Sequence, residues 1–507
     1  MTAAAQAPPS SPGSAASTGV RHGAVTAVVC LALAAVVAAM SSLNVALPDI
    51  ARSTHASQTQ LEWVIDAYSL VFAALLLPAG AIGDRYGRRR ALIIGLAIFG
   101  AGSLLAMFAG DASQLIALRA VLGMGAALVM PATLSTITGT FPPAERTKAV
   151  SIWAGVAGGA AVLGLLCSGV LLEFWSWRSV FGLNVVLAVL AIVGTIRFVP
   201  ESADKDAPKV DRGGALLAVL GLVALVFSII EAPTAGWASA RTLLGIAVGV
   251  VVLAGFVSYE LRQLHPMLNP RIFSSRRLSA GSTSIFIQFF AFFGFIFVML
   301  QYLQLVRGDS AIISALSMLP MAAGMMPAAR TSPLLVARLG ARRVCVTGLV
   351  LIAAGLTVLS QLDAGSSYWF IVAGLVPLGV GMGLAMTPAT SAITEALPAS
   401  QQGVGSAMND LSREVGGALG IAVIGSVLAG VYRSNLSLPG APEALVEKAK
   451  GSLAVAAHLG GSAAQAAHSA FMDGLHLALL VGAGAAVLAA VSVALLLRRP
   501  GSNAALR

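Results

Sequence analysis

The sequence predicts an all-α polytopic membrane protein, in which two six-helix bundles are related by pseudo-two-fold symmetry and two further helices are inserted between them. Three observations predict this class: the composition, the long apolar stretches and an internal repeat. Of the 507 residues, 57% are hydrophobic and only 10% are charged, whereas an ordinary soluble domain has about 25% charged residues. Because so few polar side chains cannot cover a water-facing surface, the composition argues against a soluble enzyme, a soluble nucleic-acid binder and a disordered scaffold.

The individual helices follow from the lengths of the apolar stretches. A helix needs about 20 apolar residues to cross a hydrocarbon core about 30 Å thick. The short alternating segments that are typical of a membrane β-barrel do not occur. Fourteen stretches are long enough, and we expect one transmembrane helix in each: 24–48, 61–83, 91–109, 113–139, 149–172, 179–199, 214–232, 242–260, 279–305, 310–336, 344–362, 368–395, 403–431 and 471–497.

The domain organisation follows from this series of helices. The Ala-, Pro- and Ser-rich start is not followed by a short apolar segment with a cleavage site, so we expect the first helix to be retained. The predicted parts are a disordered cytoplasmic tail (1–22), an N-terminal six-helix bundle (23–199), a cytoplasmic linker with the two inserted helices (200–260), a second cytoplasmic linker (261–278), a C-terminal six-helix bundle (279–498) and a cytoplasmic tail (499–507).

The distribution of basic residues predicts the orientation. An even number of spans places both termini on one side of the membrane. If that side is the cytoplasm, it holds 21 of the 31 lysines and arginines, and the opposite side holds 7. This excess satisfies the positive-inside rule. The formal net charge of +10 is therefore an orientation signal that needs no nucleic-acid partner, and we expect a multi-pass protein of the cytoplasmic membrane with both termini in the cytoplasm.

No cofactor, metal or disulfide is expected. The three cysteines lie far apart, in or beside apolar stretches and without a CxxC spacing, at Cys30, Cys167 and Cys345, which favours small core residues over a metal site. The chain has no GxxxxGK[ST] phosphate loop. ATP-driven pumping by this chain alone is therefore not expected, and the energy for any transport must come from an ion gradient or from the substrate's own gradient.

An internal repeat relates the two halves of the chain. The segment Asp84-Arg-Tyr-Gly-Arg-Arg-Arg90 follows the second predicted helix, and Ala337-Arg-Leu-Gly-Ala-Arg-Arg343 follows the tenth. Leu122-Gly-Met-Gly125 in the fourth helix likewise matches Leu378-Gly-Val-Gly381 in the twelfth. Helices 1–6 and 9–14 are therefore expected to be equivalent halves. Parallel repeats of this kind build transporters whose halves rock around a site at the bilayer midplane.

These motifs resemble the major facilitator superfamily, specifically its fourteen-helix drug:proton antiporter branch. The segment Gly80–Arg90 is similar to the signature loop between helices 2 and 3, and Leu118–Pro131 is similar to the helix 4 motif. The resemblance covers nearly the whole chain, because further segments typical of the branch are Asn44–Pro48, Trp63–Leu70, Gln301–Gln304 and Asn409–Gly417. It implies a monomeric secondary transporter, not an enzyme, which exports small amphipathic drugs or antibiotics across the bilayer in exchange for protons by alternating access.

The chain departs from this branch at two positions. The branch usually has an aspartate in helix 1 where this chain has Ala39, and helix 5 reads Gly164-Leu-Leu-Cys-Ser-Gly169 in place of Gly-Pro-x-x-Gly-Gly. A common proton site and part of a common antiport hinge are thus absent. The alternative is an exporter or facilitator of a single native metabolite with altered or no proton coupling. A membrane sensor or enzyme is disfavoured because the largest loop, 433–470, holds only two acids and two histidines.

Charged residues inside the predicted spans are the first candidates for proton and substrate coupling. A charge in the bilayer costs several kcal/mol, so each needs a partner, a water-filled cavity or a function. Arg119 keeps its proton and is either a fixed cation that tunes a neighbouring acid or a clamp between helices. Asp66 is the first substitute for the acid that is missing at Ala39. The alternative is a solvated interfacial residue at the positive end of its own helix.

A second charged group lies in the thirteenth predicted helix. Asp410, Arg413 and Glu414 are spaced i,i+3 and i,i+4 and therefore share one helix face. We expect this face to point inward, because lipid would penalise it. Either Asp410 or Glu414 is a second proton site with Arg413 compensating, or Asp410 and Arg413 are a silent pair that anchors the helix.

The remaining candidates concern gating and the substrate cavity. Gating residues are expected in the signature loop, at Gly80, Asp84, Arg85, Gly87 and Arg88. When the cytoplasmic side is closed, Asp84 is expected to pair with Arg88 and to approach the start of the thirteenth helix, and both contacts would bias a two-state equilibrium. The alternative is that the arginines only hold topology. Polar cavity-lining residues are expected at Ser41, Asn44, Tyr68, Gln301 and Gln304. Of the many phenylalanines in the ninth helix, one or two are expected to contact an aromatic substrate.

Overall fold

The computed structural model describes residues 22–203, 211–264, 266, 268–396, 402–457 and 459–497, and all regular elements among these residues are helical. The tails predicted for 1–22 and 499–507 lie outside the described residues, except for His22. Residues 204–210 of the linker predicted to begin at residue 200 also lie outside them. The helices are α1 (His22–Thr54), α2 (Gln58–Tyr86), α3 (Arg88–Ala106), α4 (Ala112–Thr140), α5 (Pro143–Phe174), α6 (Arg178–Phe198), α7 (Arg212–Ala235), α8 (Ala240–Glu260), η1 (Pro270–Ser274), α9 (Arg276–Gln301), η2 (Tyr302–Val306), α10 (Ala311–Ser317), α11 (Leu319–Leu339), α12 (Ala341–Leu359), α13 (Tyr368–Thr394), α14 (Gln402–Asn435), α15 (Glu443–Gly451), α16 (Leu453–Ala457) and α17 (Gly461–Leu496).

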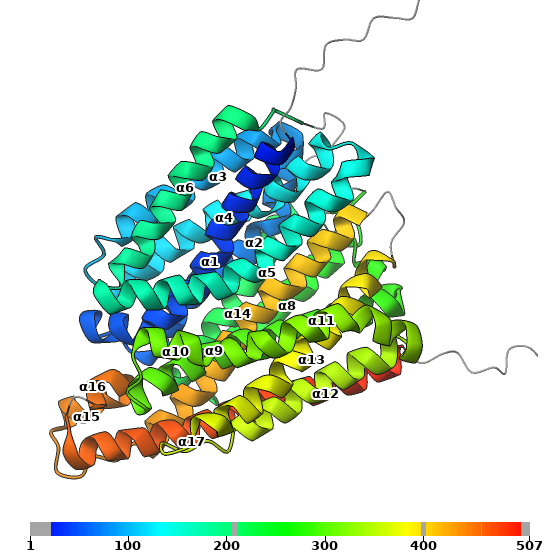
Figure 1. The fold of residues 1–507 in the computed structure, drawn as a ribbon. Coiled ribbons are helices and arrows are strands. Elements are labelled where there is room, and N and C mark those ends of the chain that lie inside the picture. The colour runs from blue at the N-terminus through cyan, green and yellow to red at the C-terminus, as the bar shows by residue number, and fades with distance from the viewer. Residues whose placement is uncertain are drawn as a thin grey trace, which may run out of the picture.

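Fourteen long helical segments run alternately up and down one bundle. In the described part of the chain, thirteen segments are long and apolar enough to cross a membrane, counting α9 with η2 and α10 with α11 as one segment each. The fourteenth is α5, which has 32 residues. Both ends of the described chain lie at one end of the bundle, which we call the terminal end, and α15 and α16 lie at the opposite end, which we call the α15 end (Figure 1).

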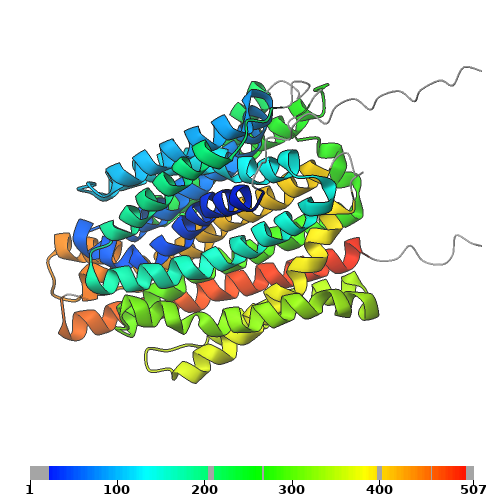
Figure 2. The same cartoon turned by 45° about the horizontal axis from the view of Figure 1, so that its top comes forward.

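The packing pairs of the two halves correspond to each other. In the first half α2 and α3 both pack on α4, α1 packs on α5, and α3 packs on α6. The equivalent pairs of the second half are α11 and α12 on α13, α9 on α14, and α12 on α17. Figures 1 and 2 show the two halves side by side, with α1–α6 coloured blue to blue-green and α9–α17 coloured green to red. The predicted two-bundle fold is confirmed at the level of helix pairs.

Glycines at equivalent positions allow the closest of these contacts. A Cβ added at Gly125 of α4 would lie 2.7 Å from the carbonyl oxygen of Gly95 in α3. In the second half, a Cβ at Gly381 of α13 would lie 2.5 Å from the carbonyl oxygen of Gly348 in α12. Small residues let membrane helices approach to backbone contact. The sequence repeat is thus also a repeat of the helix crossing.

The inserted pair lies beside the contact between the two halves. Helices α7 and α8 pack on each other, and α7 also packs on α2 of the first half and α14 of the second. Because α2 and α14 contact each other directly, α7 completes a three-helix junction. This junction joins elements that are far apart in the sequence.

The structure differs from the predicted helices in two places. The predicted tenth span is interrupted after Ser317, where α10 ends and α11 begins, with Pro320 in the first turn of α11. The loop predicted for 433–470 contains α15, α16 and the first turns of α17, which starts at Gly461. Tyr432 of α14 connects this segment to the bundle, because its hydroxyl donates a hydrogen bond to the Ala449 carbonyl at 2.8 Å.

Candidate functional site

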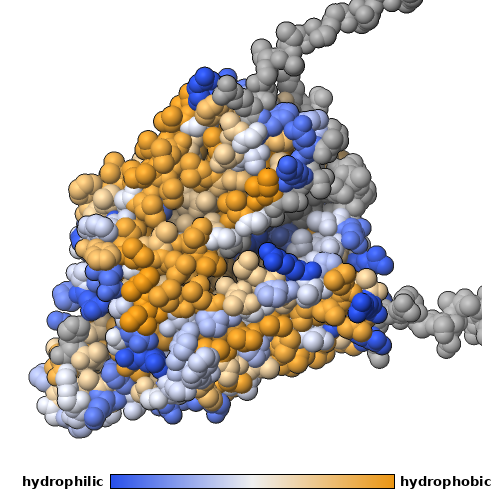
Figure 3. All heavy atoms as spheres, in the orientation of Figure 1, coloured by the Kyte–Doolittle hydropathy of each residue, from blue (hydrophilic) through white to orange (hydrophobic). Residues whose placement is uncertain are grey.

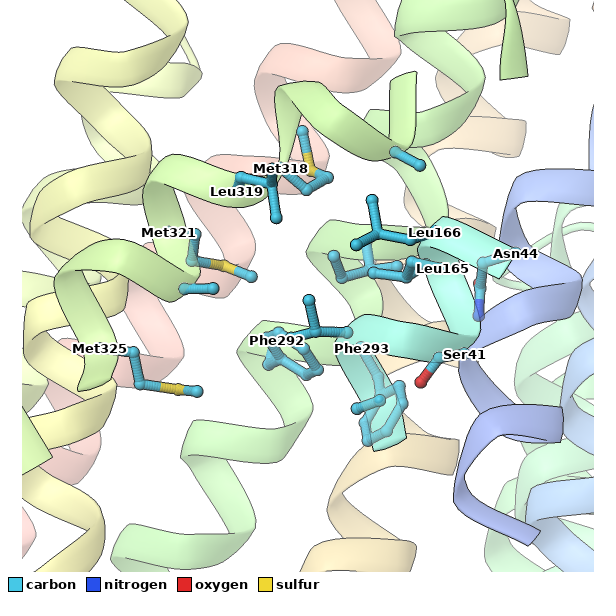
Figure 4. A pocket seen from close by; sticks show the side chains of 15 residues that line it. Ser41, Asn44, Leu165, Leu166, Phe292, Phe293, Met318, Leu319, Met321 and Met325 are labelled. Carbon is cyan, nitrogen blue, oxygen red and sulfur yellow. The ribbon is translucent and has the colours of Figure 1, made fainter. Parts of the chain in front are cut away.

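A small cavity lies between the two halves. It is lined by side chains of α1 and α5 from the first half and of α9, α10 and α11 from the second (Figure 4). Its volume is about 60 Å³, whereas pockets that hold drug-sized ligands measure about 300–1,000 Å³. In this conformation the cavity therefore has room for a few water molecules, and a drug-sized ligand requires the halves to move apart.

The lining of this cavity is apolar with one polar edge. Ser41 and Asn44 of α1 form that edge, and Met321 and Met325 lie across the cavity from them (Figure 4). Asn44 donates through Nδ2 to the Met40 carbonyl at 3.0 Å, while its Oδ1 is buried without a partner in the described structure. The cavity thus offers one free amide acceptor to a molecule that is otherwise held by apolar contacts.

Aromatic rings and methionines supply these apolar contacts. Phe292 and Phe293 come from α9, with Met318, Met321 and Met325 from the segment that contains α10 and α11. The flexible thioether side chains adapt to irregular shapes and contact aromatic rings favourably, and aromatic faces attract cations. The predicted contact of one or two phenylalanines of this helix with a substrate is consistent with this placement.

The five predicted cavity residues fall into two groups. Ser41 and Asn44 line the cavity. The hydroxyl of Tyr68 instead donates to the Val36 carbonyl at 3.1 Å, and Gln301 donates to Phe297 in its own helix. Gln304 donates from η2 to the Val45 carbonyl of α1 at 2.9 Å and so joins the two halves.

Sequence reasoning missed the three cavity methionines. Their spacing, i, i+3 and i+7, places them on one helix face and was the available signal. A methionine stripe at this spacing equally describes a face that packs against neighbours, so the spacing alone did not single them out.

Arg119 and Asp66 are both buried in the first half. Arg119 of α4 donates through Nε to the Val64 carbonyl of α2 at 2.8 Å, and its Cζ lies 4.3 Å from the ring centroid of Tyr68. Asp66 is fully buried and interacts electrostatically with Arg119. The alternative of a solvated interfacial Asp66 is therefore wrong.

The polar atoms of this pair are incompletely bonded. Both carboxylate oxygens of Asp66 and both terminal nitrogens of Arg119 are buried without a hydrogen-bond partner in the described part of the chain. Buried polar groups are normally satisfied by protein or water. The site therefore has free donors and acceptors that water or a transferred proton can use.

The charged face of α14 divides into a pair and a separate acid. Arg413 lies 3.8 Å from Asp410, measured from Nη1 to Oδ1, and its Cζ lies 4.6 Å from the ring centroid of Phe289 in α9. Glu414 is buried, one of its carboxylate oxygens has no partner among the described residues, and it interacts electrostatically with Tyr68. The predicted inward orientation of this face is consistent with these contacts, and Glu414 faces the side of the bundle that holds Arg119.

The signature loop is held within its own half. Asp84 accepts a hydrogen bond from Arg88 at 2.8 Å, and the Asp84 side chain is 41% exposed. Gly87 has φ +122°, and a Cβ there would lie 2.6 Å from Oε1 of Glu201, which also accepts from the backbone N–H of Arg89 at 3.2 Å. The loop therefore requires glycine at this position and is anchored to the end of the first half.

The other predicted gating residues are placed less distinctively. Arg85 lies with its Cζ 6.0 Å from the ring centroid of Tyr86, and a Cβ at Gly80 would make an ordinary contact with Pro131 at 3.5 Å. Residues 397–401, which precede α14, lie outside the described residues. The predicted approach of Asp84 to the start of this helix stays a prediction.

Two equivalent helical halves, a cavity lined by both and buried ionisable groups within the bundle are the features of a membrane transporter of the alternating-access type. The sequence model of the Major Facilitator Superfamily matches residues 29–421. The chain belongs to this superfamily.

Relatives of known name cover nearly the whole chain. The chain is 32% identical to the tetracenomycin C resistance and export protein of Streptomyces glaucescens over 495 residues, which is 93% of the chain and 91% of the relative. It is 34% identical to the methyl viologen resistance protein SmvA of Salmonella typhimurium, over 90% of the chain and 92% of the relative. It is 35% identical to the multidrug efflux pump LfrA of Mycolicibacterium smegmatis, over the same shares.

Solved structures share the fold. A bacterial homologue of the human lysosomal transporter Spinster, in an inward-facing and unoccupied conformation, superposes with a TM-score of 0.67 at 17% identity, over 94% of this chain and 96% of that one. The nucleoside transporter NupG superposes with a TM-score of 0.60 at 10% identity, over 94% and 100%.

Proposed function

We propose that this protein exports amphipathic drugs or antibiotics across the cytoplasmic membrane in exchange for protons. The observation that carries the proposal is the apolar cavity between the halves, with Asn44 on its polar edge, close to helices that hold buried acids. The names of the relatives, which are resistance and efflux proteins, support the same substrate class. A small apolar cavity with one acceptor suits amphipathic molecules better than sugars or ions, which need several polar partners.

The proposed orientation places the terminal end in the cytoplasm and the α15 end outside. The excess of basic residues on the side of the termini supports it. Figure 3 shows a broad apolar surface over the middle of the molecule and hydrophilic side chains toward both ends. This distribution suits a bilayer that surrounds the middle of the bundle.

The proposed state is closed on the outside. Direct hydrogen bonds between the halves lie toward the α15 end, from Gln304 to Val45 at 2.9 Å and between Glu62 and Ser426 at 3.1 Å. Helix α10 also packs on α5 at this end. Opening to the outside must break these contacts.

Proton coupling is proposed to use Asp66, Arg119 and Glu414. These groups are buried and interact through Tyr68 or directly, which suits a route for protons between the halves. One proton that moves through 100 mV releases about 2.3 kcal/mol, which sustains a substrate gradient of roughly 40-fold. Antiport of one proton is therefore sufficient for useful efflux.

A second candidate function is a facilitator or exporter of one native metabolite without proton coupling. The observation that favours it is Ala39, which is buried in α1 where related transporters usually have an acid. In this case transport would continue when the proton gradient is removed.

One experiment separates the two candidates. The chain is expressed in a host that lacks its own efflux pumps, and susceptibility to a panel of cationic and aromatic antibiotics is measured with and without a protonophore. Drug:proton antiport predicts resistance that the protonophore abolishes. In everted vesicles it also predicts substrate-dependent proton release. Resistance that survives the protonophore would contradict proton coupling, and no resistance to any compound would contradict drug export and favour the second candidate.

A further inference from the structure

A fully buried glutamate lies at the junction of α2, α14 and α7. Glu62 is 0% exposed, although it is only one turn into α2. Its Oε2 lies 3.1 Å from the hydroxyl oxygen of Ser426 in α14, and that hydroxyl also lies 2.9 Å from the carbonyl oxygen of Ile229 in α7. These three groups join both halves and the inserted pair at one point.

The carbonyl of Ile229 needs a donor from outside its own helix. In an α-helix the carbonyl of residue i accepts from the N–H of residue i+4. Here that residue is Pro233, which lies inside α7 and has no N–H. Because Ile229 is buried and a buried carbonyl without a partner is costly, the hydroxyl of Ser426 is the donor that this carbonyl requires.

Proton counting then fixes the state of Glu62. A serine hydroxyl has one proton to donate and two lone pairs that accept. If Ser426 donates to Ile229, it cannot also donate to Glu62, and the hydrogen bond between Glu62 and Ser426 must run from the carboxylic acid to the hydroxyl. Only a protonated glutamate can donate it.

The charges around Glu62 favour the same state. The titratable groups that interact with it are two further acids, Asp66 of α2 and Glu231 of α7. From α14 it is approached by Gly425, where an added Cβ would lie 2.9 Å from the carboxyl carbon of Glu62. Its second oxygen is buried without a partner in the described structure. An ionised Glu62 would therefore be a buried anion that faces two acids and no cation among the described residues, which is expensive.

We propose that Glu62 is a proton-dependent lock: protonated, it closes the α15 end through the chain Glu62–Ser426–Ile229, and loss of its proton releases that end. When α2 and α14 separate, the carboxyl group is exposed to the water outside, and the junction closes again only after the group has taken up a proton from that water. Linkage is reciprocal, so the proton stabilises the closed junction as much as the closed junction holds the proton. Resting on the proposed antiport function, this makes Glu62 the residue that couples proton loss to outward opening.

The proton has a next acceptor within the same helix. Asp66 follows Glu62 at i+4 and therefore lies one turn deeper on the same face, beside Arg119. Two acids this close do not ionise independently. A proton that leaves Glu62 toward Asp66 moves from the α15 end toward the centre of the bundle, and the pair gains or loses one negative charge with each proton exchanged with solvent.

The test measures the opening of the α15 end directly, without substrate. In a background with Cys30, Cys167 and Cys345 replaced by alanine, spin labels are placed on exposed positions at this end, His55→Cys between α1 and α2 and Ser434→Cys on α14. The distribution of distances between the two spin labels is recorded by double electron–electron resonance in lipid nanodiscs between pH 5 and pH 9. In the labelled protein that keeps Glu62, we expect a population with a short distance between the labels, which represents the closed α15 end. The fraction of this population is expected to fall as the pH rises.

Glu62→Gln is the first test variant, because its amide donates to Ser426 at every pH. It is expected to keep the short-distance population at all pH values, so that the pH response is lost. The contribution of Glu62 to the infrared band of buried carboxylic acids should disappear in this variant. A pH response that survives Glu62→Gln, or a distance distribution that does not respond to pH before substitution, would overturn the proposal.

Pro233→Ala tests the proton count without touching the acid or the serine. It restores the N–H that Ile229 lacks, so Ser426 becomes free to donate to an ionised Glu62. The closed state is then expected to persist to higher pH than in the parent protein. Pro333→Ala, on an exposed position of α11, is the matched control and should leave the pH response unchanged. An unshifted response in Pro233→Ala would contradict the lock.

The readout also separates this inference from the proposed function. A pH-dependent lock in a protein that exports no drug would refute the proposed function and leave the lock in place. Drug:proton antiport together with an unaltered pH response in Glu62→Gln would refute the lock and leave the proposed function in place.

Discussion

The guanidinium of Arg119 lies over the ring of Tyr68, with 4.3 Å between Cζ and the ring centroid, and not in a direct ion pair with Asp66. The aromatic face and the Val64 carbonyl, which accepts from Nε at 2.8 Å, hold the cation in place. Asp66 therefore experiences the positive charge while its oxygens stay free of direct hydrogen bonds. A carboxyl group in this position can exchange a proton without first breaking an ion pair.

Arg119→Lys is expected to lower drug efflux by more than tenfold. Lysine keeps the charge but loses the planar stacking on Tyr68 and the donor to Val64, and a desolvated cation–π contact is worth about 2 kcal/mol. Initial rates of dye efflux from loaded cells measure the effect.

The matched control for this substitution is Arg330→Lys, on an exposed position of α11, which should keep the parental rate. Membrane insertion of both variants is checked by their level in isolated membranes. Parental efflux in Arg119→Lys would show that charge alone is required.

Asp66→Asn is expected to reduce substrate-dependent proton release in everted vesicles to background while drug binding persists. The amide has nearly the shape of the acid but carries no exchangeable charge beside Arg119. Glu414→Gln is measured in parallel, because this acid faces Tyr68 from the other half. Normal proton release in Asp66→Asn together with loss in Glu414→Gln would move the proton site to α14.

The sequence predicted the helices and the internal repeat because both depend on local patterns. Apolar stretches locate the spans, and the repeated Gly-x-Gly segments fall where α4 and α13 cross their neighbours, at Gly125 and Gly381. Charges within apolar stretches led correctly to buried positions for Asp66, Arg119 and Glu414, because a lone charge in a span stands out against its surroundings.

Glu62 could not be found in this way. It lies in the first turns of α2, where an acid usually faces water and the positive end of its own helix. Its burial arises from Ser426 and Gly425 of α14 and from Ile229 of α7, which are more than 160 residues away in the chain. No local pattern carries this information, although its i+4 relation to Asp66 was visible.

Met321→Ala is expected to narrow the range of exported compounds and to weaken recognition of large aromatic drugs by about tenfold. Burying a methionine side chain is favourable by about 1.5–3 kcal/mol relative to leaving it in water, and Met321 lines the cavity. Minimum inhibitory concentrations in an efflux-deficient host measure this. Met326→Ala is the control, because its side chain is 56% exposed and should leave the range unchanged; equal losses in both variants would argue against this cavity as the substrate site.

Gly125→Ala is expected to destabilise the protein by about 1–3 kcal/mol, the usual cost of forcing a methyl group into a packed contact. The new Cβ would lie 2.7 Å from the Gly95 carbonyl oxygen and from the backbone nitrogen of Phe99, so α3 and α4 must separate. Thermal unfolding in detergent measures the effect as a lower Tm.

Gly381→Ala, at the equivalent crossing of α12 and α13, should lower the Tm by a similar amount if the two halves are packed alike. Gly155→Ala in α5 is the control, since among the described residues no atom outside its own stretch of helix lies within 4 Å of its added Cβ. It should keep or raise the Tm. A drop at Gly381 with none at Gly125 would mean that the repeat of the helix crossing does not extend to its energetics.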